Sequence, residues 1–342
     1  MKSSLVKRDK LDKQLYYSIK GDFERSDELL KELLIERPND NRVLYNSAFM
    51  YLRNGDIEEG MKRLNRGRFV GVFGSPPLKY RILGSLIDIR NKNILVNLEG
   101  GFGDNFVGLK FAKELKKFGA NVYILALKQL NSFLSYQPYI TKYYNDVKEI
   151  KEKIDYWCPS LSFEHIMNYT NYSQIPRDKH LFYPVKSNIK TKGLNVGIKF
   201  QGSKFFDHDK YRSPKVSQII DVISKFQGKI NFYSLEKEQL DLPEWIKKVK
   251  IDDFCDTSNI IQQMDFVIST CTSIAHLSAG LGKKTYIMIP ILPYWLWAYE
   301  KEDNGSWYYD NVELIRQEKF GTWENVLEKL RRILNEKMYS CT

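Results

Sequence analysis

The stretch Asp265–Pro290, DFVISTCTSIAHLSAGLGKKTYIMIP, decides the fold of this chain. It contains apolar runs at 266–268 and 285–289, separated by a polar loop at 269–273 and a segment of mostly small and apolar residues at 274–281. This pattern predicts a buried strand, a loop, a helix, a Gly-Lys turn and a second buried strand. Such a βαβ unit belongs to a parallel sheet covered by helices, so the stretch predicts an α/β fold.

The loop of this unit has the composition of an anion-binding site. Its hydroxyl groups stand where the predicted helix begins, and His276 is on the first turn. Free backbone N–H groups and the positive end of the helix dipole point to the same place. The residues that carry these hydroxyls are Ser269, Thr270, Thr272 and Ser273. Either a ligand binds here, or the loop is an ordinary βα connection with a good N-cap.

The composition indicates a globular protein with a net positive charge. The 342 residues are enough for two or three domains, and the 22 Tyr, 19 Phe and 6 Trp supply a large core. The net charge of +11 permits acidic ligands but does not select one, because the basic residues are spread along the chain. The four cysteines form no CxxC pair, so we expect neither a metal site nor a disulfide framework from them. They are Cys158, Cys255, Cys271 and Cys341.

The beginning of the chain, MKSSLVKRDK, is charged and lacks the apolar core of a signal peptide. The most apolar run, 285–296, is too short to cross a bilayer and contains two prolines. We therefore expect a cytoplasmic protein without a transmembrane segment.

Residues 12–70 have the pattern of antiparallel helices. Gly21-Asp22 and Gly55-Asp56 are 34 residues apart, which is the period of tetratricopeptide repeats. The segment is similar to about one and a half such repeats, with a generic helical hairpin as the alternative. So few repeats do not bury their apolar faces alone, so we expect them to pack on the domain that follows or to bind a protein partner.

Two blocks of strand–loop–helix pattern follow a Gly/Pro-rich connector at 69–77. The first begins with a strand at 94–98 and continues with a helix at 106–118. The second begins with a strand at 194–200 and includes a helix at 257–263. They predict two Rossmann-like domains that face each other across a cleft. The expected division is a helical region at 1–75, a first α/β domain at 90–188 and a second at 189–342.

The first block has a glycine-rich loop, Gly100-Gly101-Phe102-Gly103-Asp104, between its strand and its helix. A dinucleotide fingerprint needs a third glycine where this chain has Phe106, which disfavours an NAD-dependent oxidoreductase. A carboxylate, Asp104, stands at the helix N-terminus instead. It is either an N-cap or a general base that faces the cleft.

The second block places charged residues after its first two strands. Lys199 stands where the strand at 194–200 runs into a basic loop, and Arg212 belongs to that loop, where either could bind a phosphate. Glu236 follows the next strand and could hold a ribose or a base. A solvated loop and a surface carboxylate are the alternatives.

In this order, the segments GGFGD, DYWCPSLS, VGIKFQGS, YRSP, FYSLEKEQ and DFVISTCTSIAHLSAGLGKKTYIMIP resemble the heptosyltransferase-like, family-9-like glycosyltransferases. The version that the chain resembles has tetratricopeptide-like repeats at its N-terminus. The resemblance extends over nearly the whole chain and is most specific at 253–317. It implies the GT-B fold, in which the N-terminal Rossmann-like domain binds the acceptor and the C-terminal one binds a nucleotide-sugar donor.

The resemblance also implies an inverting sugar transfer without a bound metal or cofactor, the nucleotide sugar being a co-substrate. Asp104 matches the family's catalytic base, held in the loop of Gly100, Gly101 and Gly103. Arg212 matches the basic residue that supports the diphosphate, and Glu236 the acidic residue that contacts the nucleoside. The positions that bind the donor phosphates and sugar are Thr270, Cys271, Thr272, Ser273 and His276.

Cys271 departs from the family, which usually has an aspartate that contacts the donor sugar at this position. A neutral thiol is a weak hydrogen-bond donor, so either the sugar differs, the donor is held otherwise, or the activity is lower. A degenerate family member that acts only as a binding scaffold is therefore the alternative to an active enzyme. A glycan, a protein and a nucleic acid all remain open as the acceptor.

Overall fold

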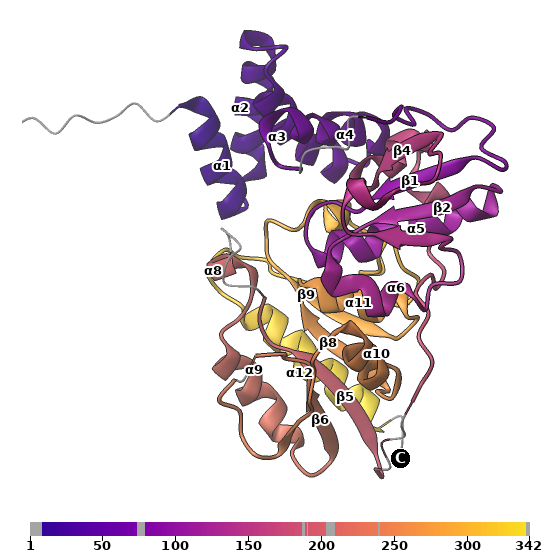
Figure 1. Cartoon of the computed structure of the whole chain (residues 1–342). Helices are drawn as coiled ribbons and strands as arrows, with labels where there is room; N and C mark the ends of the chain where they lie inside the picture. The colour runs from indigo at the N-terminus through magenta and orange to yellow at the C-terminus, as the bar shows by residue number, and fades with distance from the viewer. Residues whose placement is uncertain are drawn as a thin grey trace, which may run out of the picture.

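The computed structural model describes residues 9–73, 79–186, 189, 191–202, 209–238 and 240–339. Cys341 and part of the predicted connector at 69–77 lie outside these residues. Figure 1 shows a helical N-terminal region and two sheets, one below the other. All strand pairs in both sheets are parallel, as the βαβ pattern predicts.

The N-terminal region consists of two helical hairpins, α1–α2 and α3–α4. Each hairpin turns at a glycine with a positive φ, which is +77° at Gly21 and +87° at Gly55 and suits a residue without a Cβ atom. The following residues, Asp22 and Asp56, each accept a backbone N–H three residues further on and so cap the next helix. The helices are α1 (Lys10–Lys20), α2 (Phe23–Glu36), α3 (Asn41–Arg53), α4 (Ile57–Leu64) and the 3-10 helix η1 (Asn65–Val70).

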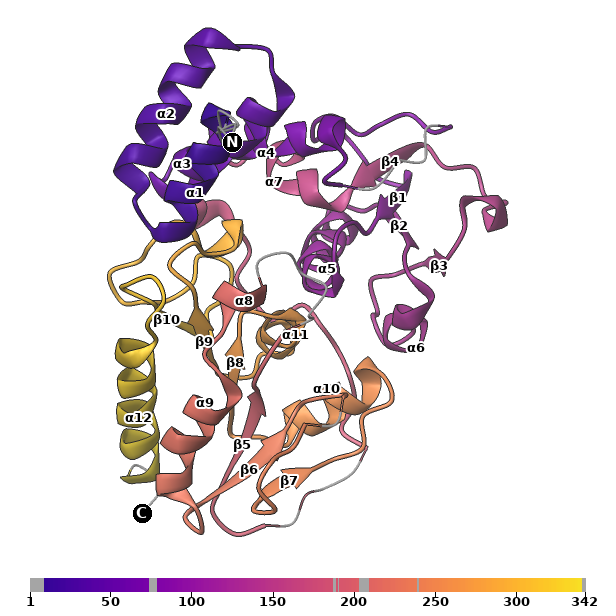
Figure 2. The same ribbon diagram turned by 90° about the vertical axis from the view of Figure 1, so that its left-hand side faces the viewer.

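Both glycine turns of the helical region pack on loops of the second sheet. The Cα atom of Gly21 lies against the side chain of Ile291, where any Cβ atom would clash. A Cβ atom on Gly55 would lie 3.0 Å from the ring of Tyr299. Both contacts fall on the segment that follows strand β9 (Thr285–Ile289) (Figure 2). The helical region therefore packs on the α/β part of the chain, as we expected of a helical segment too short to bury its apolar faces alone.

The end of the helical region is anchored to the first sheet by a buried ion pair. Arg68 of η1 donates to both carboxylate oxygens of Glu99, whose side chain is 1% exposed. Arg68 also donates to the hydroxyl of Ser162 at 2.7 Å, and that hydroxyl donates to Asn65 at 2.7 Å. Because Glu99 directly precedes the glycine-rich loop, the helical region is bound close to the predicted site.

The first sheet has four strands in the order β3-β2-β1-β4. Helix α5 begins at Phe102, four residues before the predicted start at 106, so Asp104 lies inside its first turn. The strands are β1 (Asn93–Asn97), β2 (Asn121–Leu125), β3 (Lys142–Tyr144) and β4 (Tyr156–Pro159). The helices are α5 (Phe102–Lys117), α6 (Asn131–Leu134) and α7 (Phe163–Ile166).

The second sheet has six strands in the order β10-β9-β8-β5-β6-β7. Helix α10 starts three residues earlier than predicted because Asp253 accepts two backbone N–H groups of its first turn. Besides β9, the strands are β5 (Leu194–Lys199), β6 (Ile230–Ser234), β7 (Ile246–Lys248), β8 (Phe266–Thr270) and β10 (Val312–Arg316). The helices are α8 (Asp209–Arg212), α9 (Val216–Ile223), α10 (Phe254–Gln262), α11 (Ser273–Gly280) and α12 (Glu324–Tyr339).

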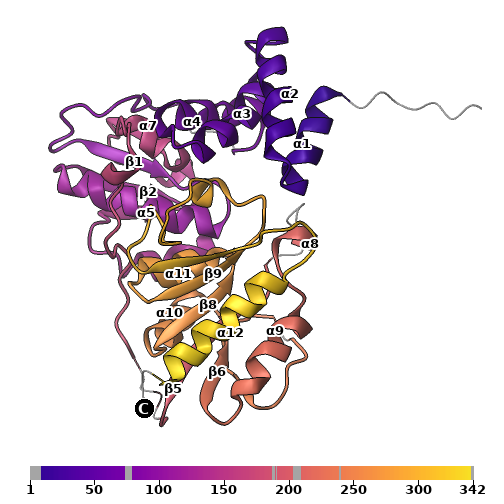
Figure 3. The same cartoon turned by 180° about the vertical axis from the view of Figure 1, so that it is seen from behind.

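The hydrophobic core has two main parts. One lies between the second sheet and helices α9 and α12, which pack on each other on the face seen in Figure 3. The other is continuous from the N-terminal helices through the first sheet to α10 and α11 of the second. Helix α5 of the first sheet packs on helix α11 of the second, and Figures 1 and 2 both show this contact. The division at 1–75, 90–188 and 189–342 stays a prediction.

Candidate functional site

The loop between β8 and α11 lies at the carboxyl edge of the second sheet, the usual binding edge of such sheets. Thr270 ends the strand, and its buried hydroxyl has no hydrogen-bond partner among the described residues. The hydroxyls of Ser269 and Thr272 lie 3.2 Å apart, and Ser273 begins the helix. The predicted hydroxyl cluster therefore forms, and a buried hydroxyl without a partner is one that a ligand could satisfy.

The glycine-rich loop of the first sheet lies directly against this helix N-terminus. A Cβ atom on Gly103 would lie 3.0 Å from Cδ2 of His276 and 3.5 Å from Cα of Ser273. Gly100 has a φ of +71°, and a Cβ atom there would lie 2.5 Å from a carboxylate oxygen of Asp104. Two loops that are about 170 residues apart in the sequence thus meet, and the absence of side chains at 100 and 103 permits it.

Asp104 lies at this meeting point and is held by two donors. Its Oδ2 accepts the backbone N–H of Gly101 at 2.7 Å, as in a helix N-terminal cap. Its Oδ1 accepts the hydroxyl of Tyr294, which comes from the second sheet's side of the molecule. Burial raises the pKa of Asp104, while these two bonds oppose that rise. Asp104 therefore caps the start of α5 and also contacts the other half of the molecule, while its role as a general base stays a prediction.

His276 is buried and neutral. Burial lowers its pKa to about 3, since the charged ring would lose its hydration. Its ring stacks on Trp297 with centroids 5.1 Å apart, and its Nδ1 lies 3.1 Å from the hydroxyl of Tyr309. His276 can therefore act as a neutral hydrogen-bonding group but not as a cation for a phosphate.

Arg212 and Cys271 lie near each other beside this centre. The guanidinium of Arg212 packs directly on the backbone of Gly202, where a Cβ atom would clash. Cys271 is buried, and burial raises the pKa of its thiol although the charge of Arg212 opposes the rise. The charge of Asp104 raises it further. The thiol is therefore neutral, and a reactive thiolate is disfavoured.

Lys199 and Glu236 form a separate, internally satisfied pair at the same sheet edge. Lys199 donates to Glu236, and the side chains are 15% and 5% exposed. The other oxygen of Glu236 accepts the backbone N–H groups of Phe200 at 2.8 Å and Gln201 at 3.2 Å. Lys199 pairs in register with Ser269 across neighbouring strands, so the pair lies next to the β8–α11 loop.

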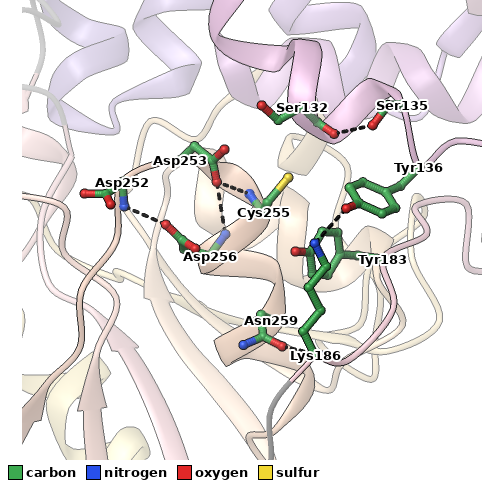
Figure 4. A pocket seen from close by; sticks show the side chains of 10 residues that line it. All are labelled: Ser132, Ser135, Tyr136, Tyr183, Lys186, Asp252, Asp253, Cys255, Asp256 and Asn259. Carbon is green, nitrogen blue, oxygen red and sulfur yellow. Dashed lines mark hydrogen bonds between the residues drawn. The ribbon is translucent and has the colours of Figure 1, made fainter.

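A pocket of about 550 Å³ opens between α6 of the first sheet and α10 of the second (Figure 4). This pocket was not predicted from the sequence. Asp252 and Asp253 follow β7 at the carboxyl edge of the sheet, and two carboxylates at that edge could have indicated a binding site there. Phe254 of α10 packs on Phe102 of the glycine-rich loop with ring centroids 4.9 Å apart, so the pocket is close to that loop. The lining residues are Ser132, Ser135, Tyr136, Tyr183, Lys186, Asp252, Asp253, Cys255, Asp256 and Asn259.

A buried polar cluster also joins the two halves, and no pattern in the sequence indicates it. Lys110 of α5 donates to the carbonyl of Tyr308, and its ammonium lies 4.2 Å from the ring centre of Tyr309. The hydroxyl of Tyr308 donates to Glu164 of α7 at 3.0 Å. Burial lowers the pKa of Lys110 to about 7 and raises that of Glu164 to about 7. Through Tyr309, the cluster reaches His276.

No protein-family model matches the sequence, and no curated protein matches it. Solved structures do match. A glycosyl transferase family 9 protein from Veillonella parvula is 10% identical, with a TM-score of 0.53 over 74% of this chain and 99% of its own. The iron-containing dodecameric glycosyltransferase TibC from enterotoxigenic E. coli is 10% identical, with a TM-score of 0.52 over 75% of this chain and 78% of its own.

These similarities show the fold. The chain is an α/β protein with two parallel, Rossmann-like sheets of the GT-B kind and a helical N-terminal region, so the predicted fold class is confirmed. No helix among the described residues is long and apolar enough to cross a membrane.

Proposed function

We propose that the protein is a glycosyltransferase that moves a sugar from a nucleotide-sugar donor to an acceptor hydroxyl. One observation carries the proposal: Asp104 of one half lies within the same small volume as the N-terminus of α11 of the other half, with Gly103 against His276. A half-buried carboxylate that lies beside an anion-binding helix end would combine a base with a phosphate site, which is what transfer from a nucleotide sugar needs.

In this reaction Asp104 accepts the proton of the acceptor hydroxyl while that oxygen forms a bond to the anomeric carbon of the donor sugar. The bond from this carbon to the diphosphate oxygen breaks, and its electron pair leaves with the nucleoside diphosphate. The attack comes from the face opposite the leaving group, so the configuration inverts. The backbone N–H groups of α11, the hydroxyls of Thr270, Thr272 and Ser273, and the charge of Arg212 stabilise the leaving diphosphate without requiring a metal ion.

The nucleoside of the donor fits the pocket between α6 and α10. Glu236, the residue expected to contact it, has its carboxylate occupied by Lys199 and two backbone N–H groups. The adjacent Lys237 donates to the carbonyl of Asp252, a lining residue of the pocket, at 2.7 Å. Glu236 and the pocket are therefore neighbours. The pocket offers carboxylates for ribose hydroxyls and the rings of Tyr136 and Tyr183 for a base. Lys199 and Glu236 then support the wall of the nucleoside site.

The acceptor is a glycan, a protein or a nucleic acid, and the helical region is a candidate surface for holding it. Tetratricopeptide-like helices commonly present such a surface, although both glycine turns here are occupied by the chain's own loops. The competing proposal, a catalytically inactive scaffold, is favoured by Cys271 in place of the family's aspartate. It predicts binding of the nucleotide sugar without transfer.

The test combines donor binding with transfer. UDP-, GDP- and ADP-sugars are screened for stabilisation against heat and for hydrolysis, with NAD as the counter-ligand. Asp104→Asn should keep the stabilisation by the preferred donor and lose transfer by at least about 100-fold, the usual contribution of a general base. Asp88→Asn, at an exposed site, is the matched control. Donor binding by the unmodified protein without any transfer would favour the scaffold, and stabilisation by NAD alone would refute the proposal.

A further inference from the structure

Tyr294 connects the catalytic carboxylate of one half to a loop of the other. Its hydroxyl donates to Oδ1 of Asp104, and the N–H of Gly101 donates to Oδ2. Burial raises the pKa of Tyr294 well above its usual value, so the hydroxyl keeps its proton and serves as the donor. Each oxygen of Asp104 thus accepts one of these two donors, and the backbone N–H of Asp104 also acts on the carboxylate. A carboxylate has about four lone-pair sites, so it retains one for a substrate hydroxyl.

The loop that carries Tyr294 is held on both sides. Toward the site, the ring of Tyr294 meets His276 edge to face, with centroids 5.9 Å apart. Away from the site, the loop carries the contacts of Ile291 with Gly21 and of Tyr299 with Gly55. The helical region therefore packs on both ends of the segment that brings Tyr294 to Asp104.

We propose that Tyr294 is a positioning residue for Asp104, supplied by the opposite half so that the carboxylate is oriented when the two halves are closed. The proposal rests on the proposed role of Asp104 as the general base. A fixed plane of the carboxylate points a lone pair at the acceptor hydroxyl, and a donated hydrogen bond favours the ionised form that a base needs.

Other titratable groups also act on this pair, and the test must separate their effects from that of Tyr294. The N–H of Gly101 stays in place in all variants. The groups that face Asp104 or Tyr294 from the surrounding elements are Tyr45 of α3, Glu99 after β1, Glu164 of α7, Cys271 before α11, His276 on α11 and Tyr308 before β10. Glu99 is itself paired with Arg68. None of these is altered when the hydroxyl of Tyr294 is removed.

The experiment compares Tyr294→Phe with Tyr299→Phe, which removes a hydroxyl from the same loop away from Asp104. Carboxyl-13C aspartate is incorporated into the full chain, the Asp104 signal is assigned from Asp104→Asn, and its titration is followed by NMR. In Tyr294→Phe the midpoint should move upward by about one pH unit, because the charged form loses a donor. In Tyr299→Phe it should not move. The acid limb of kcat/KM for sugar transfer should move by the same amount.

An unchanged Asp104 midpoint in Tyr294→Phe overturns the proposal. So does a Tyr294→Phe enzyme with a lower acceptor KM and a higher kcat, since Tyr294 would then occupy the acceptor's place. The NMR titration needs no activity, so a shifted midpoint in a protein that transfers no sugar would refute the glycosyltransferase proposal and leave the positioning contact established.

Discussion

The contact between the glycine-rich loop and α11 can be tested by adding one methyl group, in Gly103→Ala. Gly103 lies in the first turn of α5 and has no positive φ, so alanine meets no backbone strain. Its Cβ atom would lie 3.0 Å from Cδ2 of His276, closer than ordinary van der Waals contact. His276 cannot easily move away, because it stacks on Trp297 and contacts the hydroxyl of Tyr309.

Two opposing effects set the size of the change in the free energy of unfolding. Overpacking in a well-filled interior costs about 1–3 kcal/mol. Alanine in place of glycine inside a helix contributes about 0.5–1 kcal/mol in the other direction. We therefore expect Gly103→Ala to lose about 1 kcal/mol, the difference between the midpoints of these two ranges, although alanine is the better helix former.

Urea unfolding of the full chain measures this loss, with Gly84→Ala as a control at a site where a Cβ atom meets nothing within 4 Å. Gly84→Ala should be neutral or slightly stabilising. A double-mutant cycle with His276→Ala should remove most of the cost of Gly103→Ala, since the clash then has no partner. A Gly103→Ala protein at least as stable as the wild type would refute the contact between the two halves.

Two further predictions address the anchor and the neutral histidine. Arg68→Ala leaves the carboxylate of Glu99 buried without its partner and should cost about 3–5 kcal/mol in urea unfolding. Arg90→Ala, at an exposed ion pair, should show no measurable change. Equal losses of stability in Arg68→Ala and Arg90→Ala would contradict a buried Arg68–Glu99 ion pair. The unfolded chain protonates His276 near pH 6.5, but the folded chain does so only near pH 3, so folding stability should be lost as the pH falls below about 6.5. His276 should contribute about 2 kcal/mol to the loss at pH 5, and the loss in His276→Gln should be smaller by that amount, with His180, whose pKa burial also lowers to about 3, still contributing. An unchanged pH dependence in that variant would argue that the ring is hydrated.

The sequence predicts those parts of the fold that local patterns determine. The strand at 285–289 has the predicted bounds, and α11 begins and ends one residue before the predicted 274–281. These elements are short, apolar and bounded by turn residues, so their periodicity is unambiguous. The starts of α5 and α10 were placed too late, because in each case an aspartate side chain binds a nearby backbone N–H and organises an earlier first turn.

Contacts between distant segments could not be predicted in this way. The residues of the glycine-rich loop and of the β8–α11 loop were identified separately, but nothing in either segment indicates that Gly103 touches His276. The hydroxyl of Tyr294 reaches Asp104 from 190 residues away because the loop after β9 packs on the helical region. For Glu236, the sequence predicted the position at the sheet edge but not the contact. Its ion pair with Lys199 depends on the register of β5 and β6, which no local pattern determines.

Cys271 also affects the charge around Asp104 and Arg212, in addition to removing the expected contact with the donor sugar. The thiol is neutral and lies within the electrostatic reach of both Arg212 and Asp104. An aspartate in its place would put a second negative charge beside Asp104 and raise the pKa of that base further, since like charges disfavour ionisation. It would also neutralise part of the charge of Arg212, on which the proposed stabilisation of the departing diphosphate depends. Under the proposed function, cysteine gives up one carboxylate contact to the sugar, while Asp104 ionises more readily and the proposed phosphate site stays more positive.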